Sequence, residues 1–345
     1  MKVLHLLSSN TFSGAENVVF QIIMSTQSID SLYCSVTGPI KNDLLTNKIN
    51  HILIEKLTLN NVSKIIKDVK PDLVHAHDVR ATAIAVLASK KAPVISHMHV
   101  NDESMRIVSR KSLIFLLISF KLKHVFWVSE SSFKKYFFRN VVKRKSSVLI
   151  NVMDKQWIID KKNSDLDNYQ FDLCFVGRLV YQKDPLKFID IIKLVTDRIP
   201  TLQVGIVGDG ELRKEIEDKI LELSLKSNVK LFGYNPNPLK IISESKILVM
   251  TSRFEGTPMV ALEALALGTP IIATPTDGLM NLVEEGFNGY LQSDNRDISD
   301  KIIKILTNNS LYNELSQNSI SKFDQINNVQ NYANLIVKEY LEAIK

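Results

Sequence analysis

The chain has 345 residues and 45% hydrophobic content, enough apolar material for two globular cores, and it carries a net charge of +6. Its two cysteines, Cys34 and Cys174, argue against a disulfide scaffold and indicate a reducing compartment. The longest apolar run, Leu113 to Phe120, is much shorter than the roughly 18–20 residues of a membrane span, and the polar loop after Leu7 argues against a signal peptide. We therefore expect a cytoplasmic protein that is soluble or lies peripherally on a membrane.

Short apolar runs alternate with helical patterns over residues 1–160. Runs such as KVLHLL, PDLVHAH and APVISHMH have the length of buried strands, and GAENVVFQIIMST has helical periodicity. Strands that alternate with helices form parallel sheets with helices on both faces. The rhythm therefore predicts a Rossmann-like N-terminal domain over residues 1–160, with ligands at the carboxyl ends of its strands.

A basic and aromatic segment runs from Ser104 to Ser147 and holds eleven Lys or Arg residues but one acid, Glu130. Nucleic acid would pair its phosphates with the basic side chains and stack its bases on the rings, but no nucleic-acid-binding pattern is present. An anionic membrane surface would attract the segment by roughly 1 kcal/mol per basic residue, and we favour it. As an alternative, the aromatic residues are simply part of the core and the lysines face water, and this explains part of the segment's composition equally well. The expected membrane contacts are Arg110, Lys111, Lys121, Lys123, Lys134, Lys135, Arg139, Lys143, Arg144 and Lys145.

The β/α rhythm restarts after a polar run, which predicts a linker over residues 161–170 and a second Rossmann-like domain over residues 171–325. A final helix is expected over residues 326–345. Arg178 and Lys183 follow a buried strand of the second domain. A planar guanidinium and an ammonium group at a strand end suit a diphosphate, although surface charges near a turn are common without one.

The stretch from Thr251 to Thr274 predicts a loop, a helix and a strand. Thr257 is the expected N-cap with Pro258 at the first helical position, and Gly268 is the expected stop. A helix N-terminus at a strand end offers N–H groups and partial positive charge to a phosphate.

Two carboxylates flank this helix start, Glu255 in the loop and Glu263 inside the helix. The arrangement suits a ligand with phosphates in the middle and hydroxyls at both ends, as in a nucleotide sugar. An ordinary sheet crossover with a solvated Glu and a loop Glu has the same spacing, so the spacing alone leaves both interpretations open.

The string SRFEGTPMVALEALALGTPIIAT resembles the E-x7-E signature of the retaining glycosyltransferases of the GT-B fold, specifically glycosyltransferase family 4. The resemblance is strong over the second domain and weaker over the first. It implies an α/β protein of two Rossmann-like, doubly wound parallel-sheet domains facing a cleft, with the last helix crossing back to the first domain. The implied donor-binding residues are Gly14, Arg178, Lys183, Gly208, Tyr234, Glu255, Gly256, Thr257, Pro258, Met259, Val260 and Glu263.

The same resemblance implies an acceptor side in the first domain. Ser13 and Gly14 match the family's Gly-Gly-x-Glu loop with Ser13 in place of the first glycine, and His77 ends an H-x-H pattern. His99 takes the place of a strand-end histidine that faces the acceptor and the sugar, where it can relay a proton or bind a hydroxyl. Ser13, His77 and His99 are the implied acceptor-side residues, and His99 and Glu255 the implied catalytic ones; a hydrogen-bonded strand-end histidine is the alternative for His99.

The sequence predicts no metal. His75, His77 and Asp78 invite a metal interpretation, but we find no further ligands nearby in the sequence. Arg178, Lys183 and the helix N-terminus are placed to stabilise the departing diphosphate, the role that a divalent ion would otherwise have.

The implied activity is transfer of a hexosyl group from a nucleoside-diphosphate sugar, with retention. UDP is the expected nucleotide and GDP the alternative; the expected acceptor is a saccharide, lipid-linked, in capsular polysaccharide or lipopolysaccharide biosynthesis. Glu263 would bind the ribose and Glu255 the sugar. The alternatives are a nucleotide-sugar epimerase of the same fold and a non-catalytic, nucleotide-sugar-binding partner subunit.

Overall fold

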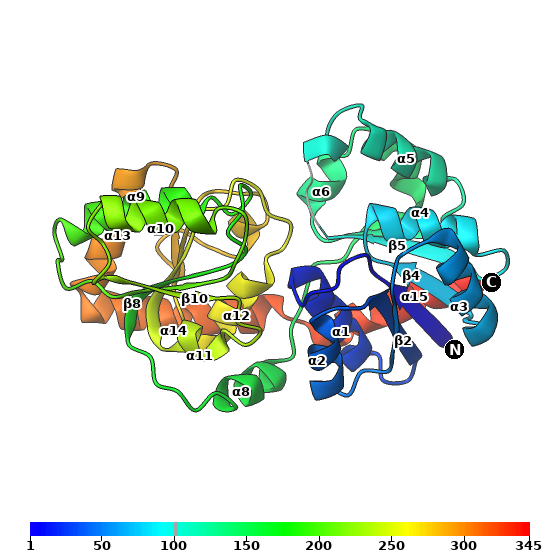
Figure 1. The fold of residues 1–345 in the computed structure, drawn as a ribbon, viewed down its shortest axis with the longest axis horizontal. Coiled ribbons are helices and arrows are strands. Elements are labelled where there is room, and N and C mark those ends of the chain that lie inside the picture. The colour runs from blue at the N-terminus through cyan, green and yellow to red at the C-terminus, as the bar shows by residue number, and fades with distance from the viewer. Residues whose placement is uncertain (100–102) are drawn as a thin grey trace. The chain divides into compact units, whose positions relative to one another are not determined.

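The computed structural model describes residues 1–99 and 103–345, which form two compact units (Figure 1). Unit 1 comprises Met1–Val152 and Val329–Lys345, and unit 2 comprises Met153–Asn328. Each unit is a parallel β-sheet with helices on both faces. The predicted class, two Rossmann-like doubly wound α/β domains, is confirmed.

Seven parallel strands form the sheet of unit 1, in the order β3-β2-β1-β4-β5-β6-β7. The order reverses between β1 and β4, which makes the carboxyl ends of these two strands the topological switch point. All seven strands coincide with apolar runs of the sequence. They are β1 (Lys2–Leu6), β2 (Asp30–Val36), β3 (His51–Ile54), β4 (Leu73–Ala76), β5 (Val94–Met98), β6 (His124–Trp127) and β7 (Ser146–Val148).

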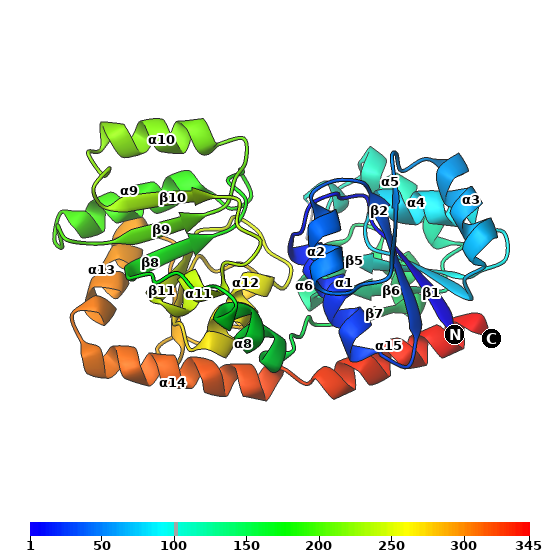
Figure 2. The ribbon, with the colours of Figure 1, turned by 60° about the horizontal axis from the view of Figure 1, so that its bottom comes forward.

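The helices of unit 1 cover its sheet in two layers (Figure 2). One face packs against α3, α4 and α5, around buried residues such as Val74 and Phe115. The other face carries α1, α2 and α15, with Phe20 and Tyr33 in its core. The helices and 3₁₀ turns are α1 (Gly14–Ser25), α2 (Ile40–Thr46), α3 (Leu59–Val69), α4 (Val79–Ala88), η1 (Glu103–Met105), α5 (Arg110–Ser119), α6 (Glu130–Lys135), α7 (Arg139–Val142), η2 (Lys143–Lys145) and α15 (Val329–Ile344).

Unit 2 repeats the same strand order with six parallel strands, β10-β9-β8-β11-β12-β13. Its switch point lies between β8 (Phe171–Val176) and β11 (Ser245–Met250). Helices α9, α10 and α13 cover one face, and α11, α12 and α14 lie together on the other (Figure 2). The remaining elements are α9 (Pro185–Thr196), β9 (Val204–Val207), α10 (Arg213–Glu222), β10 (Val229–Gly233), α11 (Leu239–Ser243), α12 (Met259–Leu267), β12 (Ile271–Ala273), η3 (Leu279–Asn281), β13 (Gly289–Leu291), α13 (Asn295–Leu306) and α14 (Asn309–Ile326).

The structure places a helix, α8 (Lys155–Asn163), where the sequence suggested the end of the first domain and the start of a linker. The Asp154 side chain accepts a hydrogen bond from the Trp157 N–H and caps this helix. Ile158 is buried, and α8 packs against α11 and α12 of unit 2. Unit 2 therefore begins at Met153. The sequence of α8 lacks clear periodicity, so its pattern alone does not predict a helix.

The C-terminal helix α15 belongs to unit 1, where it packs on α1 and β4. Tyr340 is fully buried, and its hydroxyl lies 2.6 Å from Nδ1 of the buried His75. Tyr332 lies on the same helix and is also buried, but its hydroxyl has no hydrogen-bond partner among the described residues.

These two tyrosines make a matched pair for a stability measurement. Tyr340→Phe should lower the free energy of unfolding of unit 1 by about 1–3 kcal/mol, because His75 then loses its buried hydroxyl partner. Tyr332→Phe should change it by less than about 0.5 kcal/mol, because the Tyr332 hydroxyl has no hydrogen-bond partner to lose among the described residues. Urea unfolding of the two variants measures both values, and equal losses would argue against the Tyr340–His75 bond.

Candidate active site

Two loops meet at the switch point of unit 2, one after β8 and one after β11. The first contains Arg178 and Lys183, and the second contains Glu255 and leads into α12. Because β8 and β11 are hydrogen-bonded neighbours, their carboxyl ends bring these loops together. The structure thus joins the two charged motifs that the sequence places far apart.

Lys183 and Glu255 form the central contact of this site. The Lys183 Nζ lies 2.5 Å from the Glu255 Oε1, which also accepts a hydrogen bond of 2.7 Å from the Ser252 hydroxyl. The Glu255 side chain is only 5% exposed and that of Lys183 16%, so each charge needs the other as its partner. The ammonium group and the carboxylate are therefore held at one point at the edge of the sheet.

Further contacts join the two loops. The Thr251 hydroxyl donates to the backbone carbonyls of Lys183 and Asp184, at 3.1 and 2.8 Å. The Gln182 side-chain amide donates to the Phe254 carbonyl. Sequence reasoning missed these residues. Thr251 could have been found as a polar residue directly after a buried strand, whereas Gln182 carries no such signal.

Arg178 remains available for a ligand. It is exposed, and its guanidinium donates a hydrogen bond of 3.2 Å to the neutral Gln182 side chain. No acidic partner is recorded for Arg178 among the described residues. Its positive charge is therefore uncompensated at the same strand end that carries Lys183.

Helix α12 begins one residue later than the sequence predicted. Thr257 is not the N-cap, because Pro258 itself has extended backbone with ψ 122° and the helix starts at Met259. The N–H groups of Met259 and Val260 lie in the first turn, where no earlier carbonyl can pair with them. The predicted stop is confirmed, since Gly268 adopts the left-handed conformation with φ 74°.

The other predicted donor residues lie around these loops. Glu263 is 8% exposed inside α12, and Thr257 is 7% exposed. Gly256 is buried in the loop before α12, and Tyr234 is 48% exposed directly after β10.

Two glycines allow loops of the site to approach one another closely. Gly208 has φ +142°, and a Cβ there would lie 1.9 Å from the Gly177 carbonyl oxygen. A Cβ on Gly278 would lie 1.6 Å from the carbonyl oxygen of Gly256, the residue next to Glu255. Gly278 was not among the predicted site residues, because a close approach between loops leaves no mark in a single sequence.

In unit 1, Ser13 and Gly14 lie at the start of α1, after β1. Ser13 is the N-cap, and its backbone N–H and hydroxyl contact the Glu16 Oε2 at 3.1 and 2.5 Å. Glu16 is buried, which raises its pKa against the opposing effect of the Ser13 hydrogen bonds. Gly14 is exposed.

His77 lies inside unit 1 rather than on a surface. It is 2% exposed, and its two ring nitrogens contact His5 Nδ1 and His99 Nε2, each at 3.0 Å. The expectation that His77 faces an acceptor is therefore wrong for this conformation, because register places its ring against other histidines. His99, directly after β5, is partly exposed and keeps its acceptor-side prediction.

The basic segment of unit 1 has an unusual helix at its centre. On α5 the buried residues are Ser112, Phe115 and Ser119, whereas Leu113, Ile114 and Leu117 are exposed, Leu117 by 69%. Phe120, which follows the helix, is 67% exposed. Apolar side chains thus face outward where a helix of a folded core normally buries them.

Nine of the ten predicted membrane contacts are exposed. The exception is Lys145, whose Nζ donates to the backbone carbonyls of Ser119 and Leu122 at 2.6 and 3.1 Å. Lys145 is therefore wrongly assigned to a membrane surface, since it caps the end of α5. Among the described residues, no helix is both long enough and apolar enough to cross a bilayer.

Two family profiles match this chain. The profile for glycosyl transferases group 1 matches residues 158–322, and the profile for glycosyl transferase 4-like proteins matches residues 13–128. Together they cover most of both units, and the first spans the whole Lys183–Glu255 site.

Individual proteins agree with these profiles. An uncharacterized glycosyltransferase of Methanocaldococcus jannaschii is 30% identical over 235 residues, which span 62% of this chain and 58% of the relative. An Escherichia coli protein, UDP-Gal:alpha-D-GlcNAc-diphosphoundecaprenol alpha-1,3-galactosyltransferase, is 25% identical over an alignment covering 100% of this chain and 97% of its own.

The fold has a solved counterpart in Anabaena HepE, crystallised in complex with UDP-glucose. The two structures align with a TM-score of 0.85 at 21% identity and cover 98% of each chain. At this identity the likeness concerns the fold. With its two doubly wound units, its paired charges at the switch point and both profile matches, this chain belongs to the group 1 glycosyltransferases and has the GT-B fold.

Proposed function

We propose that this protein is a retaining, metal-independent hexosyltransferase that moves a sugar from UDP to a lipid-linked saccharide in the biosynthesis of a surface polysaccharide such as capsule or lipopolysaccharide. The observation that carries the proposal is the Lys183–Glu255 pair beside the uncompensated Arg178, at the switch point of unit 2. A buried carboxylate paired with Lys183, with Arg178 in the same loop as Lys183, suits a ligand with sugar hydroxyls on one side and a diphosphate on the other.

The proposed chemistry follows from charge. Cleavage of the sugar–phosphate bond places negative charge on the departing diphosphate, and Arg178, Lys183 and the first turn of α12 would stabilise it. Glu255 would hold sugar hydroxyls, and Glu263 would accept hydrogen bonds from the ribose. In this scheme the diphosphate oxygen assists deprotonation of the acceptor, so that no enzyme nucleophile is required. His99 would bind or relay a proton at the acceptor.

The names of related proteins support the choice of UDP and of a carrier-bound acceptor. Anabaena HepE has been crystallised with UDP and with UDP-glucose. The E. coli relative acts on a diphosphoundecaprenol-linked sugar, and a Bacillus subtilis relative is a poly(glycerol-phosphate) alpha-glucosyltransferase. A polymer or lipid carrier is thus a recurring acceptor class among the relatives.

The test combines binding and turnover. A thermal-shift comparison of UDP, GDP and ADP with their sugars should give the largest shift for UDP compounds, because a ligand that binds only the folded state raises its melting temperature. Free UDP should then appear only when a saccharide acceptor is added, with an α-linked product from an α-linked donor. UDP-sugar isomerisation without acceptor would instead identify an epimerase, and binding without any turnover would identify a binding subunit. Added Mg²⁺ or Mn²⁺ should leave the rate unchanged.

We further propose that the basic segment of unit 1 binds an anionic membrane surface. The exposed apolar residues of α5 lie among basic side chains, and this combination is typical of interfacial helices. Sedimentation with vesicles should show binding to vesicles rich in anionic lipid and little binding to neutral ones. Equal binding to both vesicle types, or binding to neither, would refute this surface.

Substitution of two exposed apolar residues tests the surface directly. The Leu117→Ser/Phe120→Ser variant should bind anionic vesicles at least about tenfold more weakly, because it loses apolar area that would be buried in the interface. The matched control is Leu166→Ser/Leu221→Ser, which removes side chains of unit 2 that are 88% and 59% exposed. The control should keep wild-type vesicle binding, and both variants should keep the wild-type melting temperature.

A further inference from the structure

Histidines gather on one face of the sheet of unit 1. Six of the seven histidines of the chain lie there: His5, His75, His77, His97, His99 and His124. One row of residues in register runs across four neighbouring strands. It consists of His5 on β1, His75 on β4, Ile95 on β5 and His124 on β6. Side chains in register on parallel strands point to the same side, and residues two apart on one strand do so as well. This is the face that α15 covers, through Tyr340 on His75 and Glu339 on His124.

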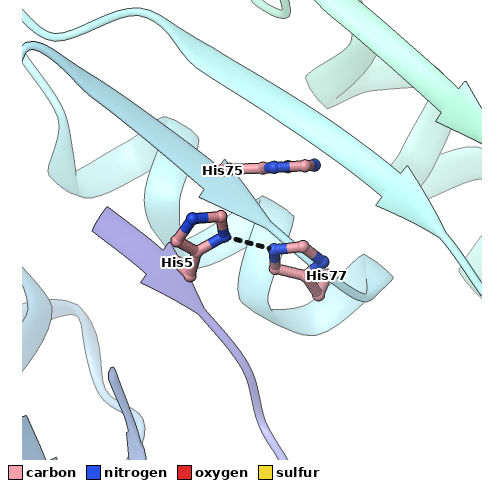
Figure 3. Close-up of side chains that lie close together, drawn as sticks. All are labelled: His5, His75 and His77. Atoms are coloured by element: carbon pink, nitrogen blue, oxygen red, sulfur yellow. Dashed lines mark hydrogen bonds between the residues drawn. The ribbon is translucent and has the colours of Figure 1, made fainter. Parts of the chain in front are cut away.

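Three of these rings converge on one point, at the switch between β1 and β4. His5 Nδ1 and His77 Nε2 are 3.0 Å apart, and one nitrogen from each of His5, His75 and His77 lies within 4.8 Å of the other two. Figure 3 shows His5 coming from β1, His75 from the neighbouring strand β4 and His77 from just after that strand, with the hydrogen bond between His5 and His77 marked. All three side chains are buried.

Each imidazole has two ring nitrogens. A neutral imidazole offers one nitrogen lone pair to a metal while its other nitrogen carries the proton.

Neighbouring residues select which nitrogen is left for a metal. Tyr340 lies 2.6 Å from the Nδ1 of His75, and His99 lies 3.0 Å from the Nδ1 of His77. If these Nδ1 atoms carry the protons, the Nε2 atoms of both rings present lone pairs. Such a partner on the second nitrogen is the usual arrangement for a metal-binding histidine. His75 Nε2, a proposed ligand atom, has no hydrogen-bond partner among the described residues. His5 Nε2, which would carry the proton, has none there either, so His5 lacks the second partner that His75 and His77 have.

We propose that His5 Nδ1, His75 Nε2 and His77 Nε2 bind a divalent first-row metal of the zinc class, with water or hydroxide at the fourth position. Three imidazoles are a ligand set that zinc and its neighbours favour. Tetrahedral coordination at about 2.0–2.1 Å places ligand nitrogens roughly 3.4 Å apart, close to the present His5–His77 separation of 3.0 Å. This metal site lies in unit 1 and has no role in donor binding by unit 2. A bound metal would link β1 to β4, and the hydrogen bond between Tyr340 and His75 would link helix α15 to the site.

A second set, His77, His97 and His99, could also be considered as ligands, but it is less suited. Both nitrogens of His97 lack a hydrogen-bond partner among the described residues, so no neighbour fixes its tautomer or its orientation. His97 therefore serves as the matched control for His5, because both are buried histidines of the same cluster.

The test starts with the purified wild-type protein. After dialysis against Zn²⁺ and removal of unbound metal, elemental analysis should find about one zinc per chain. Co²⁺ in place of zinc should give the strong visible absorption of a tetrahedral nitrogen site. A hundredfold excess of Zn²⁺ over its dissociation constant should raise the melting temperature by about 5–10 °C. Absence of bound metal in all three measurements would overturn the proposal.

Two variants then locate the site. His5→Leu should lose the bound metal and the melting-temperature increase, whereas His97→Leu should keep both. Circular dichroism without metal establishes that each variant is folded. Should His5→Leu fail to fold, Tyr340→Phe, which removes the orienting partner of His75, should still weaken zinc binding by about 10–100-fold. Loss of metal in His97→Leu with retention in His5→Leu would overturn the assignment. None of these measurements uses transferase activity, so they stand whether or not the proposed function holds.

Discussion

Arg178→Met and Lys183→Met are each expected to lower turnover by about a hundred- to a thousandfold. Each substitution removes one positive group from the place where the proposed reaction develops negative charge on the diphosphate, and loss of a single such donor has this size of effect. The rate of UDP release in the presence of acceptor measures it. Near-normal turnover in both variants would disprove the assignment of this site.

The free energy of unfolding of each variant shows whether lost turnover comes from lost catalysis or from a damaged fold. Lys183→Met leaves the buried Glu255 carboxylate without its cation and should lower the free energy of unfolding by about 3–5 kcal/mol. The double variant Lys183→Met/Glu255→Gln removes both charges, so it should recover most of this stability without recovering turnover. Arg178 is exposed, so Arg178→Met should lose turnover without loss of stability. Lys214→Met, on the exposed side of α10, is the control that should change neither.

Gly208→Ala is expected to destabilise unit 2 by about 3 kcal/mol and to abolish donor binding. The backbone at Gly208 has φ +142°, which side chains rarely tolerate, and the new Cβ would lie 1.9 Å from the Gly177 carbonyl oxygen. The loop that carries Arg178 begins at Gly177 and would have to move. Thermal unfolding and the UDP-induced thermal shift measure the two effects.

Gly286→Ala is the matched control for this substitution. Gly286 also has a positive φ of +75°, but nothing lies within 4 Å of a Cβ built there. It therefore reports the backbone cost alone, about 1–2 kcal/mol, and should leave donor binding intact. If both variants lost the same stability and bound UDP equally well, the contact between Gly208 and Gly177 would have no role in the site.

Several predictions from the sequence concern local chemistry, and these agree best with the structure. All seven strands of unit 1 lie in the apolar runs, and Gly268 ends α12 in the left-handed conformation. The start of the same helix was predicted one residue early, because Pro258 is equally compatible with the N-cap and the first helical position. Helix α8 was missed because its sequence lacks clear periodicity, whereas contacts with unit 2 stabilise it.

The basic segment shows what the sequence left open. Its residues fit either a membrane surface or a core with lysines facing water, and the structure buries Ser112, Phe115 and Ser119 but exposes Leu113 and Leu117. Which face of a helix is buried depends on the side that packs against neighbouring elements, and that side is decided by the fold around it. The exposed face is what makes a membrane surface a specific proposal.

Metal ligation shows the same limit. His75 and His77 are visible in the sequence as an H-x-H pair, and the prediction of no metal depended on finding no other ligand nearby. His5 lies 70 residues before His75, and only the parallel pairing of β1 with β4 brings it beside that pair. Ligands that are absent nearby in the sequence can therefore still be present in space, and the absence of a metal stays a prediction.

By itself, the sequence determined the elements of this protein: its strands, most of its helices and the residue types at the strand ends, because hydrophobic periodicity and capping act over a few neighbouring residues. It also carried the string around Glu255 that identifies the family. Only the tertiary structure decided which of these residues meet. Lys183 and Glu255 are paired because β8 and β11 are adjacent in the sheet, and the histidines cluster because β1, β4 and β5 are. Strand order and register bring together residues far apart along the chain, and a single sequence does not record those pairings.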